Sequence, residues 1–339
     1  MAGTGKAHLT NGTGNVPQDD VILTVEDLVV EFPAAGGQKV HAVSGISFDV
    51  REGETLGLVG ESGCGKSTTG RAVMQLEQAT TGKVVFEGTD LTTLSGEDMR
   101  RMRTRMQMIF QDPISSLNPR RKVKDIVREG LSIWHQNQKG LSSERVDDIL
   151  RSVGLSPEMV GNRRSHEFSG GQCQRICVAR ALVLDPKIII CDEPVSALDV
   201  SVQAQILNLL EDMKARYGLT LIFIAHDLAV VKNISDRVCV MYLGKMCEIG
   251  PSDNLYEQPL HPYTEALLKS IPHPDPTHPV SDEALEGDLP SPINPPSGCR
   301  FRTRCPQAAD ICTEEEPEIR EIAPQHYVAC HFPLMAVAE

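Results

Sequence analysis

One stretch of the sequence has the residue types and the spacing that bind phosphate. The run GESGCGKS at 60–67 fits the pattern G-x-x-x-x-G-K-[ST], follows an apolar run that predicts a strand, and precedes a helix that can begin at Lys66. Glycines let the backbone fold around a phosphate, and the helix N-terminus adds the positive end of a dipole. We expect Lys66 to reach the β- and γ-phosphates of a nucleoside triphosphate and the Ser67 hydroxyl to hold Mg²⁺. The candidate nucleotide-binding residues of this stretch are Gly60, Ser62, Gly63, Cys64, Gly65, Lys66, Ser67 and Thr68.

A second group of reactive side chains is the acidic pair Asp192-Glu193, which ends the apolar run that begins at Lys187. An acidic pair alone is often a solvated strand end, but downstream of a phosphate-binding loop it indicates the second half of a nucleotide-hydrolysing site. We expect Asp192 to hold Mg²⁺ through its water shell, and Glu193 to orient and polarise the attacking water as general base. Together with the loop, this pair predicts an enzyme that hydrolyses a nucleoside triphosphate.

The elements that must position these residues alternate between short apolar strands and helices. Strands are predicted at 55–59, 106–110, 187–191 and 221–225, which indicates an α/β layered sheet with a parallel core. A mostly helical stretch, including a helix at 143–153, lies between two of these strands. We expect a leader at 1–20 without regular structure, an ATPase domain at 21–270 with an inserted helical subdomain at about 115–170, and a distinct C-terminal region at 271–339. Eight prolines between Pro272 and Pro296 predict that the last region begins with a linker that forms neither helix nor central strand.

Composition excludes some classes of function. The formal net charge of -13 argues against a surface that holds the phosphate backbone of nucleic acid, so we expect no nucleic-acid partner. No run approaches 18 consecutive apolar residues, which predicts that no segment spans a membrane. The first 20 residues lack the apolar stretch of a signal peptide.

The run FSGGQ at 168–172 resembles the signature of ABC proteins, although the usual first residue is Leu rather than Phe. The same four letters SGGQ could by themselves form an ordinary helix cap, but QR at 174–175 and ARAL at 179–182 follow in the expected order, before the acidic strand. A helix is expected from Gln172 to Leu184. The resemblance implies that its N-terminus binds the γ-phosphate held by a partner ATPase, through oriented backbone amides. The residues concerned are Ser169, Gly170, Gly171 and Gln172.

Further ABC elements follow in order, and their roles are implied by the resemblance. Gln111 resembles the Q-loop glutamine, which contacts Mg²⁺ and water and senses the membrane subunits. Asp199 ends a D-loop at 196–199, and His226 resembles the switch histidine that contacts the γ-phosphate. Phe32 is the candidate that stacks on adenine, with a core role as the alternative. The implied fold is an ABC-type P-loop NTPase with a RecA-like core, an antiparallel β subdomain and an inserted helical subdomain.

Within ABC proteins the sequence is most similar to the oligopeptide/dipeptide importer ATPases, and to their F-type at 106–110 and 118–123. The runs that carry this likeness are QDP at 111–113, SLNPR at 116–120, HPYT at 261–264 and the tail from Cys299 to Pro306. The resemblance implies an ATPase at the cytoplasmic face of the membrane that powers di- and oligopeptide import. Its implied partners are a second, D-type ATPase, two permeases and, indirectly, an external peptide-binding protein. Nickel or sugar import remains an alternative, and a soluble ABC ATPase that acts on DNA or ribosomes is a more distant one.

Four cysteines in the tail form a separate candidate site: Cys299, Cys305, Cys312 and Cys330. Their spacing, C-x5-C-x6-C-x17-C, contains no C-x2-C pair, which disfavours a standard zinc ribbon. Four thiolates could still bind zinc or an iron–sulfur cluster, or remain without a ligand. The resemblance to the peptide importers implies a [4Fe-4S] cluster with a structural or redox-sensing role.

Overall fold

The structure is a computed structural model that describes residues 20–134, 139–271 and 287–334. Nearly all of the predicted leader at 1–20, and much of the proline-rich linker, lie outside the described residues. The described part of that linker, 287–296, contains no helix or strand, as its prolines predict. The chain divides into two compact units, one made of Met1–Thr93 and Ala225–Glu339 and the other of Leu94–Ile224.

The first unit contains an antiparallel sheet in the order β2-β1-β4-β5. Its strands are β1 (Val21–Pro33), β2 (Lys39–Arg51), β4 (Thr81–Phe86) and β5 (Thr89–Asp90). Alternate β1 side chains such as Leu23 and Val25 are fully buried, because successive residues of a strand point to opposite faces. This sheet is the antiparallel β part that the sequence predicts.

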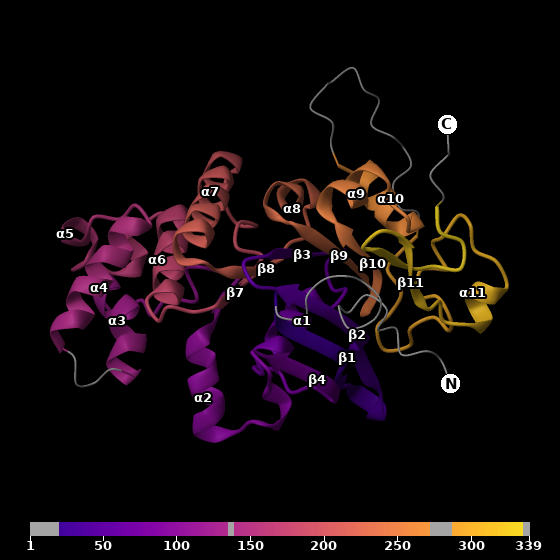
Figure 1. Cartoon of the computed structure of the whole chain (residues 1–339), viewed down its shortest axis with the longest axis horizontal. Coiled ribbons are helices and arrows are strands. Elements are labelled where there is room, and N and C mark those ends of the chain that lie inside the picture. Colours follow the sequence, from indigo (N-terminus) through magenta and orange to yellow (C-terminus); the bar gives the residue numbers. More distant parts are fainter. Residues whose placement is uncertain (1–19, 135–138, 272–286, 335–339) are drawn as a thin grey trace, which may run out of the picture. The chain divides into compact units, whose positions relative to one another are not determined.

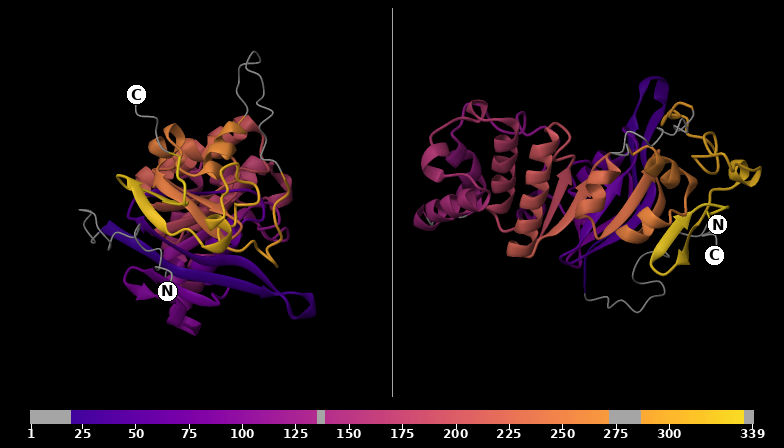
Figure 2. Two further views of the ribbon diagram at one scale, coloured as in Figure 1. Left: turned by 90° about the vertical axis from the view of Figure 1, so that its right-hand side faces the viewer. Right: turned by 90° about the horizontal axis from the view of Figure 1, so that it is seen from above.

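A second sheet of the first unit has the order β11-β12-β10-β9-β3. Its strands are β3 (Thr55–Val59), β9 (Arg237–Tyr242), β10 (Lys245–Pro251), β11 (Ile319–Ala323) and β12 (His326–Ala329). Strands β3 and β9 are parallel, whereas β12 pairs antiparallel with β10 through Glu248 and Val328. The views in Figure 2 show β11 and β12 beside β10, so the cysteine-bearing tail extends this sheet.

Helices cover the second sheet on both sides. They are α1 (Lys66–Val73), α8 (Leu228–Ile234), α9 (Ser252–Glu257) and α10 (Pro262–Lys269). In Figure 1, α8, α9 and α10 lie on one side of β3, β9 and β10, and α1 lies on the other side with β1 and β2. The short helix α11 (Ile311–Glu314) belongs to the tail.

A buried charge network joins the strands of the two sheets in this unit. Arg237 on β9 lies 3.0 Å from Asp49 of β2 and 3.2 Å from Glu54, which precedes β3. Burial raises the pKa of Glu54, while the Arg237 guanidinium acts in the opposite direction. The network fixes where β3 enters the sheet, and therefore where the phosphate-binding loop begins.

The second unit contains three parallel strands in the order β8-β7-β6. They are β6 (Met106–Ile109), β7 (Ile188–Asp192) and β8 (Thr220–Ile224), and they confirm three predicted strands to within one residue at each end. Helices α2 (Gly96–Arg105), α6 (Gly170–Leu182) and α7 (Val200–Tyr217) flank them.

The predicted helical stretch of the second unit is also present. It contains α3 (Val123–Trp134), α4 (Lys139–Ser152) and α5 (Pro157–Val160), which Figure 1 shows gathered beside α6. Short 3₁₀ turns complete the described part of the chain: η2 (Ala35–Gly37), η3 (Leu91–Thr93) and η4 (Ser165–Glu167). No helix among the described residues combines the length and the apolar character needed to cross a bilayer.

Candidate functional site

The phosphate-binding loop connects β3 to α1, as the sequence predicts. All five residues of β3 are buried, and α1 begins at Lys66. Gly65 has φ = 104°, and a Cβ at this position would lie 2.2 Å from the Ala42 carbonyl oxygen. Glycine is therefore required at this point both by the backbone conformation and by the close approach of β2.

The Lys66 side chain is buried within its own loop. Its Nζ donates hydrogen bonds to the carbonyl oxygens of Gly60 at 2.7 Å and Glu61 at 2.9 Å. Cys64 is fully buried beside it, and burial raises the pKa of its thiol. Ser62 and Gly63 are exposed at the tip of the loop, where an anion can approach.

Glu61 is held by two residues that were not predicted from the sequence to lie at this loop. Its backbone amide donates to the hydroxyl oxygen of Tyr263 at 2.9 Å. Its carboxylate accepts two hydrogen bonds from Arg304, at 2.7 and 3.1 Å. Tyr263 lies in the predicted HPYT run and Arg304 lies in the tail, so only the folded chain reveals that both contact the loop.

The two other candidates of the first unit occupy surface positions. His226 is exposed and directly precedes Asp227, whose carboxylate caps α8 by accepting from the Ala229 amide at 2.8 Å. Phe32 is half-buried on β1 opposite Val40. The ring of Phe32 is thus partly accessible, as stacking on a base requires, and its predicted role stays a prediction.

In the second unit, the structure brings Gln111 and Glu193 together. The Gln111 amide nitrogen donates to a Glu193 carboxylate oxygen at 2.9 Å. Glu193 has φ = 47°, a left-handed conformation that is uncommon outside glycine, and its own amide donates to the Ile224 carbonyl oxygen at 2.9 Å. Strained backbone of this kind clusters at functional sites. The preceding residue, Asp192, is fully buried at the end of β7.

The predicted signature forms the N-terminus of α6. The Ser169 hydroxyl accepts from the Gln172 amide, and the Gln172 side chain accepts from the Ser169 amide at 3.1 Å, which is a reciprocal capping box. The helix begins two residues before the predicted start because this cap lies at Ser169. A Cβ on Gly171 would lie 2.5 Å from a Val202 methyl carbon, so glycine lets α6 approach α7 closely.

The D-loop precedes α7, and its last residue, Asp199, is the exposed N-cap residue of that helix. Gln203 holds the loop from behind, because its amide nitrogen donates to the carbonyl oxygens of Val195 at 3.0 Å and Leu198 at 3.1 Å. Gln203 was not among the residues predicted from the sequence. Its position one turn into the helix after the loop is the signal that could have indicated this role.

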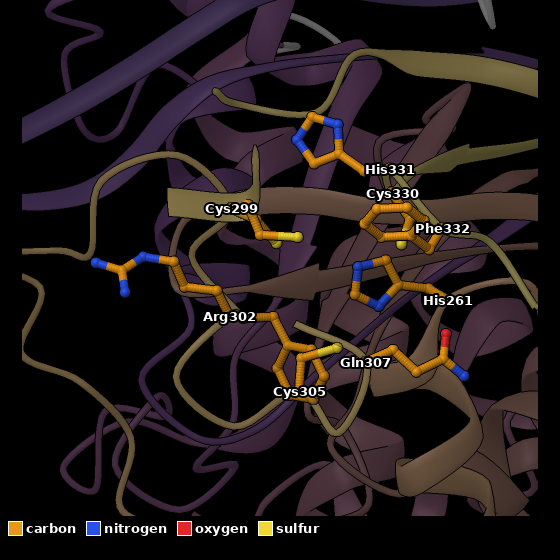
Figure 3. Close-up of a pocket in the computed structure, with 10 residues that line it drawn as sticks. His261, Cys299, Arg302, Cys305, Gln307, Cys330, His331 and Phe332 are labelled. Atoms are coloured by element: carbon orange, nitrogen blue, oxygen red, sulfur yellow. The ribbon is translucent and has the colours of Figure 1, made fainter. Parts of the chain in front are cut away.

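The four tail cysteines line one small cavity. Figure 3 shows the sulfurs of Cys299, Cys305 and Cys330 directed into the same space, next to His261. Cys312 lines the same cavity, and its carbonyl oxygen accepts from the Cys299 amide at 2.8 Å. Burial raises the pKa of the Cys299 and Cys305 thiols, and raises that of Cys330 to about 11. A bound cation would therefore be needed to keep these groups as thiolates.

Within the described part of the chain, no three His, Cys, Asp or Glu side chains are placed to hold one metal ion together. All ten cysteines are free thiols. The structure thus gathers the four cysteines of the sequence prediction without forming a single-ion site from them.

Comparison with known proteins gives two family models that match different parts of the chain. The family model described as "ABC transporter" matches residues 43–196, and the model described as "Oligopeptide/dipeptide transporter, C-terminal region" matches residues 247–312. The chain is 51% identical over 322 residues to the oligopeptide transport ATP-binding protein AppF of Bacillus subtilis, covering 92% of this chain and 98% of AppF. It is 52% identical over 326 residues to the oligopeptide transport ATP-binding protein OppF of Salmonella typhimurium, covering 93% and 97% of the two chains.

A solved structure supports the same fold. The chain resembles cbiO1 of Clostridium perfringens, part of the ABC transporter complex cbiONQ, with a TM-score of 0.62 and 29% sequence identity. The match covers 70% of this chain and 91% of cbiO1.

Proposed function

This chain belongs to the oligopeptide transport ATP-binding proteins of the ABC transporter family, and from that premise we propose that it hydrolyses ATP to power import of di- and oligopeptides. It acts at the cytoplasmic face of the membrane, bound to two permeases that receive cargo from an external peptide-binding protein. The observation that carries the proposed chemistry is the Glu193 carboxylate, held 2.9 Å from Gln111 at the end of a parallel strand.

In this proposal, residues of the first unit bind the nucleotide. Lys66 leaves the carbonyl oxygens of Gly60 and Glu61 and turns to the β- and γ-phosphates, which offer it a stronger, charged acceptor. The loop amides and the N-terminus of α1 add partial positive charge. Ser67 supplies a hydroxyl to Mg²⁺, Phe32 stacks on the base, and His226 contacts the γ-phosphate.

Residues of the second unit supply the hydrolytic chemistry. Asp192 and Gln111 would hold Mg²⁺ and its water shell. Glu193 accepts the proton of the attacking water, and Gln111 fixes the direction of that carboxylate through their hydrogen bond. Lys66 meets the developing charge on the phosphoryl group, where a bound Mg²⁺ would supply further positive charge.

The exposed signature and D-loop suit a second ATPase as partner. Ser169 and the amides that follow it cap a helix whose N-terminus can bind the γ-phosphate held by the partner. ATP then binds the closed pair better than the open pair, and this difference in affinity drives closure. The proposed partner is a D-type ATPase, with this chain as the F-type subunit.

We further propose that the cysteine cavity holds a [4Fe-4S] cluster, because Cys299, Cys305, Cys312 and Cys330 all line it and four cysteine thiolates are the ligand set of such a cluster. When bound, the cluster supplies an electron-accepting or structural centre to the tail. Iron and acid-labile sulfide near zero in protein purified without oxygen would exclude it.

The proposed machine can be tested by purification from native membranes. The tagged chain is solubilised gently, and its co-purifying proteins are identified by mass spectrometry. Two polytopic permeases and a second, different ATPase support the proposal. Recovery with DNA or ribosomes and without any membrane protein would leave the ATPase assignment intact and refute the importer. A permease pair that transports nickel or sugars would replace peptides as cargo.

A further inference from the structure

We propose that the C-terminal tail, together with α10, positions the phosphate-binding loop. Arg304 of the tail and Tyr263 of α10 are positioning residues that act on Glu61. We name these three residues the loop clamp. The inference rests on the proposed role of the loop in binding nucleotide, and it adds the tail of the same chain as a determinant of that binding.

Glu61 is the second residue of the loop, and three of its groups are held at once. Its amide donates to the Tyr263 hydroxyl oxygen at 2.9 Å. Its carboxylate accepts hydrogen bonds from two nitrogens of the Arg304 guanidinium, at 2.7 and 3.1 Å. Its carbonyl oxygen accepts from Lys66 at 2.9 Å. The residue that the tail holds is therefore also the one against which the phosphate-binding lysine rests.

The pair between Arg304 and Glu61 has the geometry of a strong contact. A bidentate guanidinium–carboxylate pair is more directional than a single hydrogen bond, and a lysine cannot reproduce it. The Arg304 side chain is 5% exposed and the Glu61 side chain is 28% exposed, so solvent screens the pair less than a surface ion pair.

A packed aromatic cluster fixes Arg304 in place. The Phe301 carbonyl oxygen accepts from the Arg304 amide at 2.9 Å, and the Phe301 ring lies 5.2 Å from the ring of Tyr242 and 5.3 Å from that of Tyr263. The Arg304 guanidinium lies over the Tyr242 ring at 5.9 Å. Because Phe301 also lines the cysteine cavity, one buried side chain contacts both the cavity and the rings that support the clamp.

A second path from the tail reaches the other end of the loop. Arg300 donates to the Leu243 carbonyl oxygen in the turn between β9 and β10. The next residue of that turn, Gly244, donates its amide to the Cys64 carbonyl oxygen at 2.8 Å. The tail thus contacts the loop directly at Glu61 and indirectly at Cys64.

A clamp of this kind should act on nucleotide affinity rather than on the chemical step. When the clamp no longer holds Glu61, only a fraction of the molecules have the loop in the conformation that binds ATP. The observed affinity for ATP is then the intrinsic affinity multiplied by that fraction. We expect Arg304→Gln to raise the KM for MgATP about 10-fold, equivalent to about 1.4 kcal/mol. We expect kcat to change less than about twofold, because the bound loop has the same geometry once ATP is in place.

The test uses the full chain in its transporter complex. The KM and kcat for MgATP, and equilibrium binding of a fluorescent ATP analogue with Mg²⁺, are measured for Arg304→Gln, Arg304→Lys, Glu61→Gln, Tyr263→Phe and the double variant Glu61→Gln/Arg304→Gln. The matched control is Arg320→Gln, which removes the hydrogen bonds from Arg320 to the carbonyl oxygens of Cys330 and His331 at 3.1 Å. These bonds also lie in the tail, but they contact neither the loop nor the turn between β9 and β10.

The expected result is a raised KM for the clamp variants, poor rescue by Arg304→Lys, and a wild-type KM for Arg320→Gln. The double variant should be no worse than the worse single variant, since both remove one interaction. A KM within twofold of wild type in folded Arg304→Gln, or in Glu61→Gln should Arg304→Gln fail to fold, would overturn the inference. Additive effects in the double variant would also overturn it.

Lys66→Ala separates this inference from the function on which it rests. If Lys66→Ala binds the analogue as well as wild type, the loop is not the nucleotide site and the proposed function fails. If Lys66→Ala loses binding while the clamp variants keep it, only the inference about the tail fails.

Discussion

The conformation of Glu193 shows how a single residue carries the proposed hydrolysis. Its left-handed backbone, with φ = 47°, follows directly after the last residue of β7, and its amide donates to the Ile224 carbonyl oxygen. The side chain leaves the strand at this turn, where Gln111 donates to its carboxylate. A general base must be held within reach of the proton that it accepts, and this contact fixes the direction of the carboxylate.

Glu193→Gln should therefore remove proton acceptance and keep the shape of the site. We expect ATP turnover to fall about 10²- to 10⁴-fold while ATP binding persists, because the amide cannot act as a base. Steady-state hydrolysis and bound nucleotide are measured on the same preparation. Turnover near the wild-type rate would contradict the role assigned to this carboxylate.

Two loop glycines should respond differently to the same added methyl group. In Gly65→Ala the new Cβ would lie 2.2 Å from the Ala42 carbonyl oxygen, whereas in Gly63→Ala nothing lies within 4 Å of it. Both positions have positive φ, so both variants carry backbone strain of about 1 kcal/mol or more. We expect Gly65→Ala to lose nucleotide binding and Gly63→Ala to weaken it only mildly, as measured by analogue titration. Equal effects would show that close packing against β2 does not shape the loop.

At the scale of elements, β9 and α10 are the supports on which the loop depends. Strand β9 carries Arg237, whose guanidinium lies between Asp49 and Glu54 in the interior. Helix α10 carries Tyr263 of the loop clamp and starts at a buried histidine cap, where Nδ1 of His261 accepts from the Tyr263 amide at 3.0 Å. Both elements are therefore supported by polar side chains that lie out of water.

Arg237→Met should destabilise the first unit strongly. The substitution leaves two carboxylates buried without their cation, and breaking a buried pair in this way costs about 3–5 kcal/mol. Denaturant unfolding of the full chain measures the loss, and Arg237→Met with Asp49→Asn and Glu54→Gln should recover part of it. A single variant as stable as wild type would refute the role of this network.

Protonation of His261 should make stability depend on pH. Burial lowers the pKa of His261 from 6.5 to about 4 in the folded chain, against the opposing charge of Glu248. Between these two values the unfolded chain binds more protons, so the free energy of unfolding decreases as the pH falls through this window. The full effect is about 3 kcal/mol, from about 1.4 kcal/mol for each pKa unit.

The variant His261→Asn isolates this effect, because its side-chain oxygen can still cap α10 but does not titrate. Unfolding midpoints at pH 7 and pH 5 are compared for the two proteins. We expect wild type to lose more stability than the variant on acidification. The same loss in both would assign the pH dependence to other groups.

The elements that could be read from the sequence are those defined by local pattern. Thr55–Val59 and Ile188–Asp192 are continuous apolar runs, which is how strands buried on both faces appear, and the loop glycines and the SGGQ cap carry fixed local chemistry. The strands β11 and β12 were not predicted, because Ile319–Ala323 is short and carries two adjacent charged residues, without the alternation typical of a strand, and because β12 pairs with β10, far away in the sequence.

The contacts that support the candidate site could not be predicted for the same reason. Arg304 and Glu61 are separated by 243 positions, and neither belongs to a motif that specifies the other. Gln111 also reaches Glu193, 82 positions away, only after the strands that precede these two residues are in place. Local residue patterns indicate which groups are reactive, whereas the fold determines which side chains hold them.

At the scale of the whole molecule, a tail packs against the predicted phosphate-binding loop of the first unit. The tail adds β12 to the edge of β10, directs four cysteines into one cavity, and contacts the loop through Arg304. The second unit presents exposed residues at the signature and the D-loop, where the proposed partner ATPase would bind. Transport then depends on the complex, because this chain provides ATP hydrolysis and the permeases provide the path.

The central claim is that ATP hydrolysis by this chain drives peptide uptake, and transport by the reconstituted complex tests it most directly. Vesicles containing the permeases and both ATPases are supplied with a labelled oligopeptide and its binding protein on one side and MgATP on the other. We predict accumulation of peptide that requires MgATP and is lost when this chain carries Glu193→Gln. Uptake that continues with Glu193→Gln, or ATP hydrolysis that never moves peptide, would contradict the account.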